Sequence, residues 1–148
     1  MTTTSNITKI VNALVPYENG LKNAIDNVTI KGKTLEVALR EQPTWSAFYL
    51  ERSIELSTLC KQLEQELKRI RSNLTVRYNE NYNPALSERM IEKYIDKESE
   101  YCTMYEIYLE VKELHSKYEG LVDVFKSRGF TLRDITLSRV HDIQGDTL

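Results

Sequence analysis

A run of mostly small or apolar residues, spaced alternately three and four positions apart, constrains the fold of this chain more than any other feature. The run extends from residue 53 to residue 77 and fills two seam positions in each heptad. One position holds Ser53, Cys60, Leu67 and Leu74, and the other holds Leu56, Leu63, Ile70 and Arg77. This spacing is typical of a helix that packs along another helix at a shallow crossing angle. The sequence therefore predicts a long helix here, with Thr44 as its N-cap.

A second long helix is predicted after the polar break NENYNP, residues 79–84. Asn83 and Pro84 are typical of an N-cap followed by proline at the first helical position. The apolar stripe of this helix again alternates three and four, at Tyr101, Met104, Tyr108, Val111, His115, Tyr118, Val122 and Phe125. Two such helices joined by a short loop form a long antiparallel αα-hairpin. Since the 148 residues include only five Gly and three Pro, we expect an all-α chain.

The first 43 residues are more weakly patterned and are predicted to be a variable segment with short helices. ITKIVNAL fits two helical turns before Pro16, and TIKGK, residues 29–33, fits either a turn or a short strand. A short helix is predicted before Pro43. The remaining residues, 44–148, would hold the hairpin and a C-terminal helix, so that the chain is one domain overall.

The run KSRGF, residues 126–130, is predicted to be a junction between helices. Gly129 would be the left-handed residue that ends the second helix, and Lys126 and Arg128 would complement the helix dipole. Thr131 would then cap a short C-terminal helix, with Asp134 completing a capping box. A phosphate-binding loop is the alternative. One face of the short helix combines Leu132, Ile135, Arg139 and Ile143.

Charge is unevenly distributed, although the formal net charge is only −2. Residues 61–78 carry five basic and two acidic side chains. Residues 126–139 carry four basic side chains and one acidic side chain. Between them, residues 86–123 carry ten acidic and five basic side chains. Such alternation suits either self-assembly or a localised anion site.

The first basic segment supplies the candidate nucleic-acid-binding residues. They are Lys61, Lys68, Arg69, Arg71, Arg77 and Tyr78. A helical row of cations that ends in tyrosines can follow a phosphate backbone and offer rings to unstacked bases. It would read no base sequence, because it lacks a recognition helix. The alternative is the solvated flank of a coiled coil, in which Lys61 pairs with Glu64.

Catalysis is not expected from this sequence. His115 falls within the apolar stripe and His141 near the tail, and no acid or thiol stands at a triad or metal-ligand spacing. We therefore predict no catalytic residue, no metal site and no cofactor, and an enzyme built around His115 is the weakest alternative. Cys60 and Cys102 are isolated thiols, which favours a reduced intracellular setting. No signal peptide or membrane span is expected.

The run VDVFKSRGFTLRDITLSR, residues 122–139, resembles the C-terminal region of the UvsY family, the recombination mediators of T4-like bacteriophages. The resemblance extends upstream through an acidic helix and a polar break to a basic helix, KQLEQELKRIRSNL, and covers roughly residues 45–140. It implies a small helical protein that forms a ring of six or seven copies. It also implies non-specific binding of single-stranded DNA, with no nucleotide hydrolysis.

The same resemblance implies the partners and the place of action. A phage-encoded mediator acts in the host cytoplasm, where it helps a RecA-like phage recombinase replace the single-stranded-DNA-binding protein on the strand. The family's DNA-binding element is similar to Leu-Lys-X-Arg-Leu. The nearest match here is Leu67–Arg71, in which Ile70 takes the place of the second cation, and Ile70–Leu74 is an alternative register in which Asn73 does so.

The resemblance further implies that the C-terminal helix joins the copies of the ring. The candidate oligomerisation residues are Phe130, Leu132, Ile135, Arg139 and Ile143. In an assembled ring, Lys126 and Arg128 are secondary candidates for contact with phosphate. The rival interpretation is a coiled-coil structural or assembly protein of a virion that binds no nucleic acid, because heptads and a wide apolar stripe suit it equally.

Overall fold

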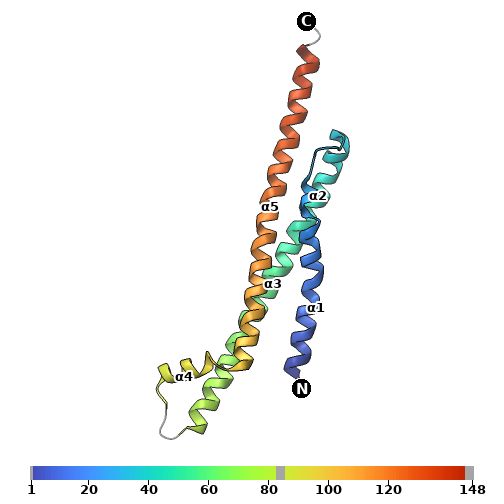
Figure 1. Ribbon diagram of the computed structural model, residues 1–148. Helices are drawn as coiled ribbons and strands as arrows, with labels where there is room; N and C mark the ends of the chain where they lie inside the picture. Colours follow the sequence, from blue (N-terminus) through green and yellow to red (C-terminus); the bar gives the residue numbers. More distant parts are fainter. Residues whose placement is uncertain (1, 83–85, 146–148) are drawn as a thin grey trace. The chain divides into compact units, whose positions relative to one another are not determined.

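The computed structural model describes residues 2–82 and 86–145, and every regular element within these ranges is a helix (Figure 1). In chain order the helices are α1 (Thr2–Lys22), α2 (Ala24–Val28), α3 (Leu35–Asn81), α4 (Glu88–Ile95) and α5 (Ser99–Gly145). The predicted all-α class is confirmed. None of the described helices combines the length and the apolar character that crossing a membrane requires.

The chain divides into two compact units, and each is discontinuous in sequence. Unit 1 combines residues up to Leu14 with Leu56–Leu114, and unit 2 combines Val15–Glu55 with the residues from His115 onward. Helices α1, α3 and α5 each contribute to both units.

The predicted helix ends at Pro16 and Pro43 are wrong, because both prolines lie inside helices. Helix α3 begins at Leu35, and its first turn is capped by Thr34, whose Oγ1 accepts a hydrogen bond from the Val37 N–H at 3.3 Å. Thr44 lies within α3 and is not its N-cap. A proline costs about 3 kcal/mol in a helix interior. Burial of Leu14 before Pro16, and of Ala38 and Tyr49 on the two sides of Pro43, offsets that cost.

The segment TIKGK, residues 29–33, forms a turn and not a short strand, the other structure that its sequence fits. It lies between α2 and α3, and Gly32 has φ 83°, the one positive φ among the described residues. Glycine adopts this left-handed conformation without a steric penalty, because it lacks Cβ.

The predicted second long helix is interrupted. Asn83 and Pro84, the predicted cap, lie outside the described residues. Helix α4 follows the extended residue Ser87, and a turn at residues 96–98 separates it from α5. This turn lets α4 depart from the direction of α5 and bury Ile91 and Ile95 in unit 1. The periodic stripe that predicts this helix begins at Tyr101, after the turn, and so carries no information about residues 96–98.

The predicted junction at KSRGF is also wrong, because α5 continues through Gly129 to Gly145 without a break. Thr131 does not cap a new helix, since its Oγ1 donates to the Ser127 carbonyl at 3.1 Å. The helix is held in place because Phe125, Arg128 and Leu132 lie on one face and are all buried in unit 2. Lys126 and Arg128 accordingly do not lie in a last helical turn.

Gly129 has a packing role in place of the predicted turn. A Cβ at this position would lie 3.0 Å from Gln42 Nε2, and that nitrogen donates a hydrogen bond to the Phe125 carbonyl at 2.6 Å. The missing side chain therefore lets Gln42 reach the backbone of α5.

The heptad pattern predicted the core of unit 1 well. The buried seam residues of α3 in this unit are Leu56, Leu63, Leu67, Ile70 and Leu74. On α5, Met104, Ile107, Val111 and Leu114 are buried, whereas Tyr101 and Tyr108 are only half-buried on its flank.

An aromatic cluster forms the core of unit 2. The Tyr49 ring stacks on Phe125 with centroids 4.6 Å apart, and it lies 6.0 Å from the Tyr118 ring. The Tyr118 hydroxyl donates to the Tyr17 carbonyl at 2.7 Å. Burial raises the pKa of Tyr118 to about 12, so this hydroxyl stays protonated as a donor at neutral pH.

Replacement by alanine is predicted to change the free energy of unfolding in opposite directions at two glycines. We expect Gly120→Ala, on an open stretch of α5, to raise the free energy of unfolding by about 0.5–1 kcal/mol. Gly20→Ala would place its Cβ against the buried Tyr118 hydroxyl and should lower that free energy by about 1–3 kcal/mol. Urea denaturation followed by circular dichroism measures both. Equal changes in the two variants would contradict the packing of Gly20 on Tyr118.

Candidate nucleic-acid interface

The outer face of α3 in unit 1 carries Lys61 and Lys68. Both lysines are exposed, and they lie on the side of the helix opposite the buried seam. Seven residues of helix place them roughly 10 Å apart along the axis. Neither lysine makes an ion pair with any residue that the structure describes. Gln65 and Ser72 share this face, and the exposed Glu64 lies between the two lysines on its flank, where its Oε1 accepts a hydrogen bond from the Tyr108 hydroxyl at 2.8 Å.

Arg69 is exposed on one flank of that face, but its charge is engaged. Its guanidinium forms a two-pronged ion pair with Glu66, in which Nε lies 2.9 Å from Oε2. The hydrogen bonds from Arg69 lower the pKa of the Glu66 carboxyl. Since Glu66 already neutralises it, Arg69 offers less attraction to a phosphate than an isolated arginine would.

Arg71, on the opposite flank, serves a contact within unit 1. Its Nη2 donates to the Tyr101 hydroxyl at 3.1 Å and lies 3.4 Å from Asp96 Oδ1. The guanidinium also lies over the Tyr101 ring, 5.1 Å from its centroid. The hydrogen bond that Arg71 donates to the Tyr101 hydroxyl is the main cause of the raised pKa of Arg71. This arginine therefore joins α3 to α5 as well as adding positive charge.

Near the end of α3, Arg77 is exposed and Tyr78 belongs to a group of three rings. We call Tyr78, Tyr82 and Tyr94 the tyrosine cluster. The Tyr78 ring lies 5.4 Å from that of Tyr94 and 5.7 Å from that of Tyr82, and the last two rings stack at 6.2 Å. Glu98 accepts the hydrogen of the Tyr78 hydroxyl and raises its pKa to about 12.

Tyr94 is not among the predicted site residues, because the predicted hairpin had no α4. Tyr82 and Tyr94 are both exposed, so the cluster presents ring surface to solvent beside Arg77. Exposed rings next to cations are the two components of non-specific recognition of single strands.

The two secondary candidates differ from each other. Lys126 is exposed, 3.4 Å from Asp123. Arg128 is only 3 % exposed. Its Nε donates to the Val28 carbonyl at 3.1 Å, and its Nη1 donates to the Ala38 carbonyl at 3.2 Å and to Gln42 Oε1 at 2.6 Å. Arg128 is therefore a structural residue of unit 2 and lies out of reach of a phosphate in this structure.

The candidate oligomerisation residues are also split by the structure. Leu132 is fully buried in unit 2 and is not available to another copy, and Ile135 is half-buried. Phe130, Arg139 and Ile143 are exposed. Leu137 lies seven residues from Phe130 and is also exposed, as is Val140. Leu137 and Val140 are not among the predicted residues, because the predicted helix begins at Thr131 and presents a different face.

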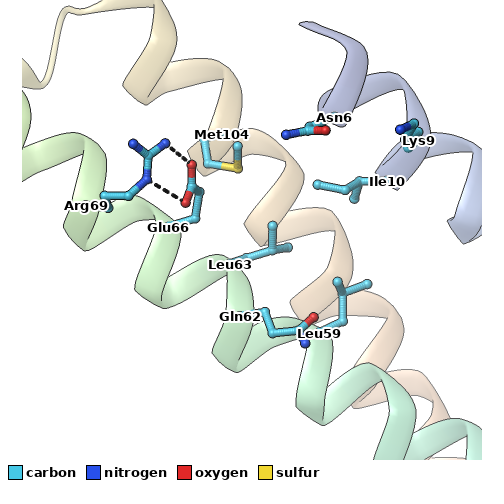
Figure 2. Close-up of a pocket in the computed structure, with 9 residues that line it drawn as sticks. All are labelled: Asn6, Lys9, Ile10, Leu59, Gln62, Leu63, Glu66, Arg69 and Met104. Carbon is cyan, nitrogen blue, oxygen red and sulfur yellow. Dashed lines mark hydrogen bonds and ion pairs between the residues drawn. The ribbon is translucent and has the colours of Figure 1, made fainter. Parts of the chain in front are cut away.

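Unit 1 also contains a groove of about 370 Å³ (Figure 2). Figure 2 shows the Glu66–Arg69 pair at one end and Met104 of α5 beside it. The other lining residues come from α1 and α3 and are Asn6, Lys9, Ile10, Leu59, Gln62 and Leu63.

Within the described residues, no three His, Cys, Asp or Glu side chains gather closely enough to hold a metal ion. His115 Nε2 lies 3.6 Å from Glu119 Oε1.

No family model, curated protein or solved structure matches this chain. Lys61, Lys68 and Arg77 are the predicted site residues that lie exposed on α3 without a described acidic partner. Arg69 and Arg71 lie on its flanks in ion pairs, and Tyr78 lies within the tyrosine cluster.

Proposed function

We propose that this chain is a non-catalytic recombination mediator that binds single-stranded DNA without sequence preference. In this proposal it helps a RecA-like phage recombinase displace the single-stranded-DNA-binding protein, in the cytoplasm of an infected host. The resemblance of KSRGF and its surroundings to the UvsY family supports this class of protein.

The observation that carries the proposal is the outer face of α3. Lys61 and Lys68 point to solvent there and form no ion pair with a described residue, and Arg77 and the tyrosine cluster follow towards the helix end. Cations on a helix bind the phosphate backbone whatever the base sequence, and exposed rings stack on bases.

A ring of six or seven copies would make a weak site effective. Two lysines on one chain release few counterions, whereas several copies on one strand add their contributions. In the proposed assembly, α3 and α5 are the arms of an αα-hairpin, and the exposed residues near the end of α5 contact the next copy.

The proposal is tested by fluorescence anisotropy of labelled oligo-dT across a series of salt concentrations. We expect binding at low salt that weakens steeply as salt rises. The double variant Lys61→Ala with Lys68→Ala should bind roughly tenfold more weakly or worse. It should also lower the slope of log K against log salt by about 1 for each lysine removed.

A matched control distinguishes the loss of this lysine site from the change in net charge. Lys22→Ala with Lys31→Ala removes two exposed lysines of unit 2 and makes the same change in net charge. This control should bind oligo-dT like the unaltered chain. Absence of binding at low salt, or an equal loss in both double variants, would contradict the proposal.

The rival function, a virion coiled-coil or assembly protein, is favoured by one specific observation. Phe130, Leu137 and Val140 expose apolar side chains on the last turns of α5, which suits contact with another protein. This rival predicts an oligomer whose mass, measured by light scattering, does not change when oligo-dT is added.

A further inference from the structure

Three tyrosines of α5 form a second row of rings in unit 1, separate from the tyrosine cluster. Tyr101, Tyr105 and Tyr108 share one face of the helix, and we call them the tyrosine ladder. The Tyr101 and Tyr105 rings are nearly parallel, 9° apart, with centroids separated by 6.1 Å. The Tyr105 and Tyr108 centroids are also 6.1 Å apart. Tyr105, the middle ring, is 43 % exposed.

A cation lies over each end of the ladder. Arg71 stands over the Tyr101 ring, and Lys112 Nζ lies 5.7 Å from the centroid of Tyr108. The outer rings are also fixed by their hydroxyls, because Arg71 donates to Tyr101 and Tyr108 donates to Glu64 at 2.8 Å. The two outer rings are therefore held in place before any ligand arrives, and Tyr105 lies between them, which reduces the entropy cost of binding.

The ladder borders the basic face of α3. Glu64, which accepts the hydrogen bond from Tyr108, lies in the helix between Lys61 and Lys68. Arg71 likewise follows Lys68 by three residues and reaches Tyr101. Side chains three and four residues apart are neighbours on a helix surface. The two lysines and the ladder thus belong to one surface of unit 1.

A hollow of about 430 Å³ opens beside the ladder. It is lined by Asp96, Tyr101, Cys102, Tyr105 and Glu106. Its carboxylates repel phosphate, but they can accept hydrogen bonds from the amino groups of cytosine, adenine and guanine. The cations needed for phosphate lie on the α3 side, at Lys61, Lys68 and Arg71.

We infer that the tyrosine ladder is a stacking surface for the bases of single-stranded DNA whose phosphates lie on Lys61 and Lys68. The inference rests on the proposed function and adds a base-binding element to it. Stacking on an aromatic side chain is sequence-tolerant, because every base has a π-face. Tyr105 is the ring on which a base stacks, and the amino edge of that base faces the hollow.

The test uses the full chain and two labelled oligonucleotides of equal length, oligo-dC and an abasic strand that has the phosphates without the bases. Tyr105→Ala should raise the dissociation constant for oligo-dC about tenfold and leave that for the abasic strand unchanged. Tyr105→Phe keeps the ring and should bind oligo-dC like the unaltered chain. The salt dependence should be the same in all three proteins, because no cation is removed.

The outcomes separate this inference from the proposed function. If oligo-dC binds with the expected salt dependence but Tyr105→Ala binds it as tightly, the ladder does not stack on bases and the proposed function stands. If no strand binds, both fail. If Tyr105→Ala lowers the mass of the assembly in light scattering, the ladder joins copies of the chain, and the inference is overturned.

Discussion

Replacement of Arg128 by methionine is expected to lower the free energy of unfolding by about 3 kcal/mol or more. The guanidinium donates to two backbone carbonyls, those of Val28 and Ala38, and to the side-chain oxygen of Gln42. Methionine fills a similar volume but donates no hydrogen bond, so these acceptors lose their partner inside unit 2. An acceptor left unsatisfied in a buried site costs about 1–3 kcal/mol. Urea denaturation followed by circular dichroism measures the loss.

The neighbouring cation provides the matched control. Lys126→Met makes the same change in net charge two residues away, at an exposed position on α5. We expect it to change the free energy of unfolding by no more than about 0.5 kcal/mol. Arg128→Lys keeps the charge but cannot reach all the acceptors, so it should also destabilise the chain. Equal effects at residues 126 and 128 would show that Arg128 is not the buried donor described above.

The second large effect is expected at Phe125. Its ring is fully buried and stacks on Tyr49, so Phe125→Ala should lower the free energy of unfolding by about 3–5 kcal/mol. Phe125→Leu fills most of the space and should cost less. Val124→Ala, at the exposed neighbouring position, should change that free energy little. A loss below about 1 kcal/mol in Phe125→Ala would contradict the aromatic core of unit 2.

The helices and the core of unit 1 were predictable because the spacing of apolar residues along the chain determines both. Leu63, Leu67, Ile70 and Leu74 fall on one face of a helix by their spacing alone, and burial of that face follows. The same periodicity placed Lys61 and Lys68 on the outer face. These two residues are therefore the part of the candidate site that local pattern could position.

The helix boundaries were not predictable from local signals, because distant contacts decide them. Proline normally ends a helix, yet Pro16 and Pro43 lie inside α1 and α3. A glycine that ends a helix and a glycine that admits a neighbouring side chain look alike in sequence. What distinguishes Gly129 is Gln42, which lies far away in the chain and next to it in space.

The roles of the arginines depend on the same kind of contact. Arg71 and Arg128 were both predicted as phosphate-binding residues, but each has partners that are remote in sequence. Arg71 finds Tyr101, and Arg128 finds Val28 and Ala38. Sequence spacing along one helix carries no information about such partners. Tyr94 was missed for a related reason, since its place in the tyrosine cluster depends on the turn before α5.

The discontinuous composition of the two units has a consequence for the order in which the chain takes shape during synthesis. Unit 1 is complete once Leu114 has left the ribosome, whereas unit 2 begins at Val15 and still lacks its segment from His115 onward. Tyr49 emerges early, yet its stacking partner Phe125 is translated only after the last residue of unit 1. Contacts between residues so far apart form slowly, because the intervening chain must first be ordered. Translation of Leu56–Leu114 therefore completes unit 1 first. Tyr49, although translated earlier, becomes buried only after the segment from His115 onward has been made.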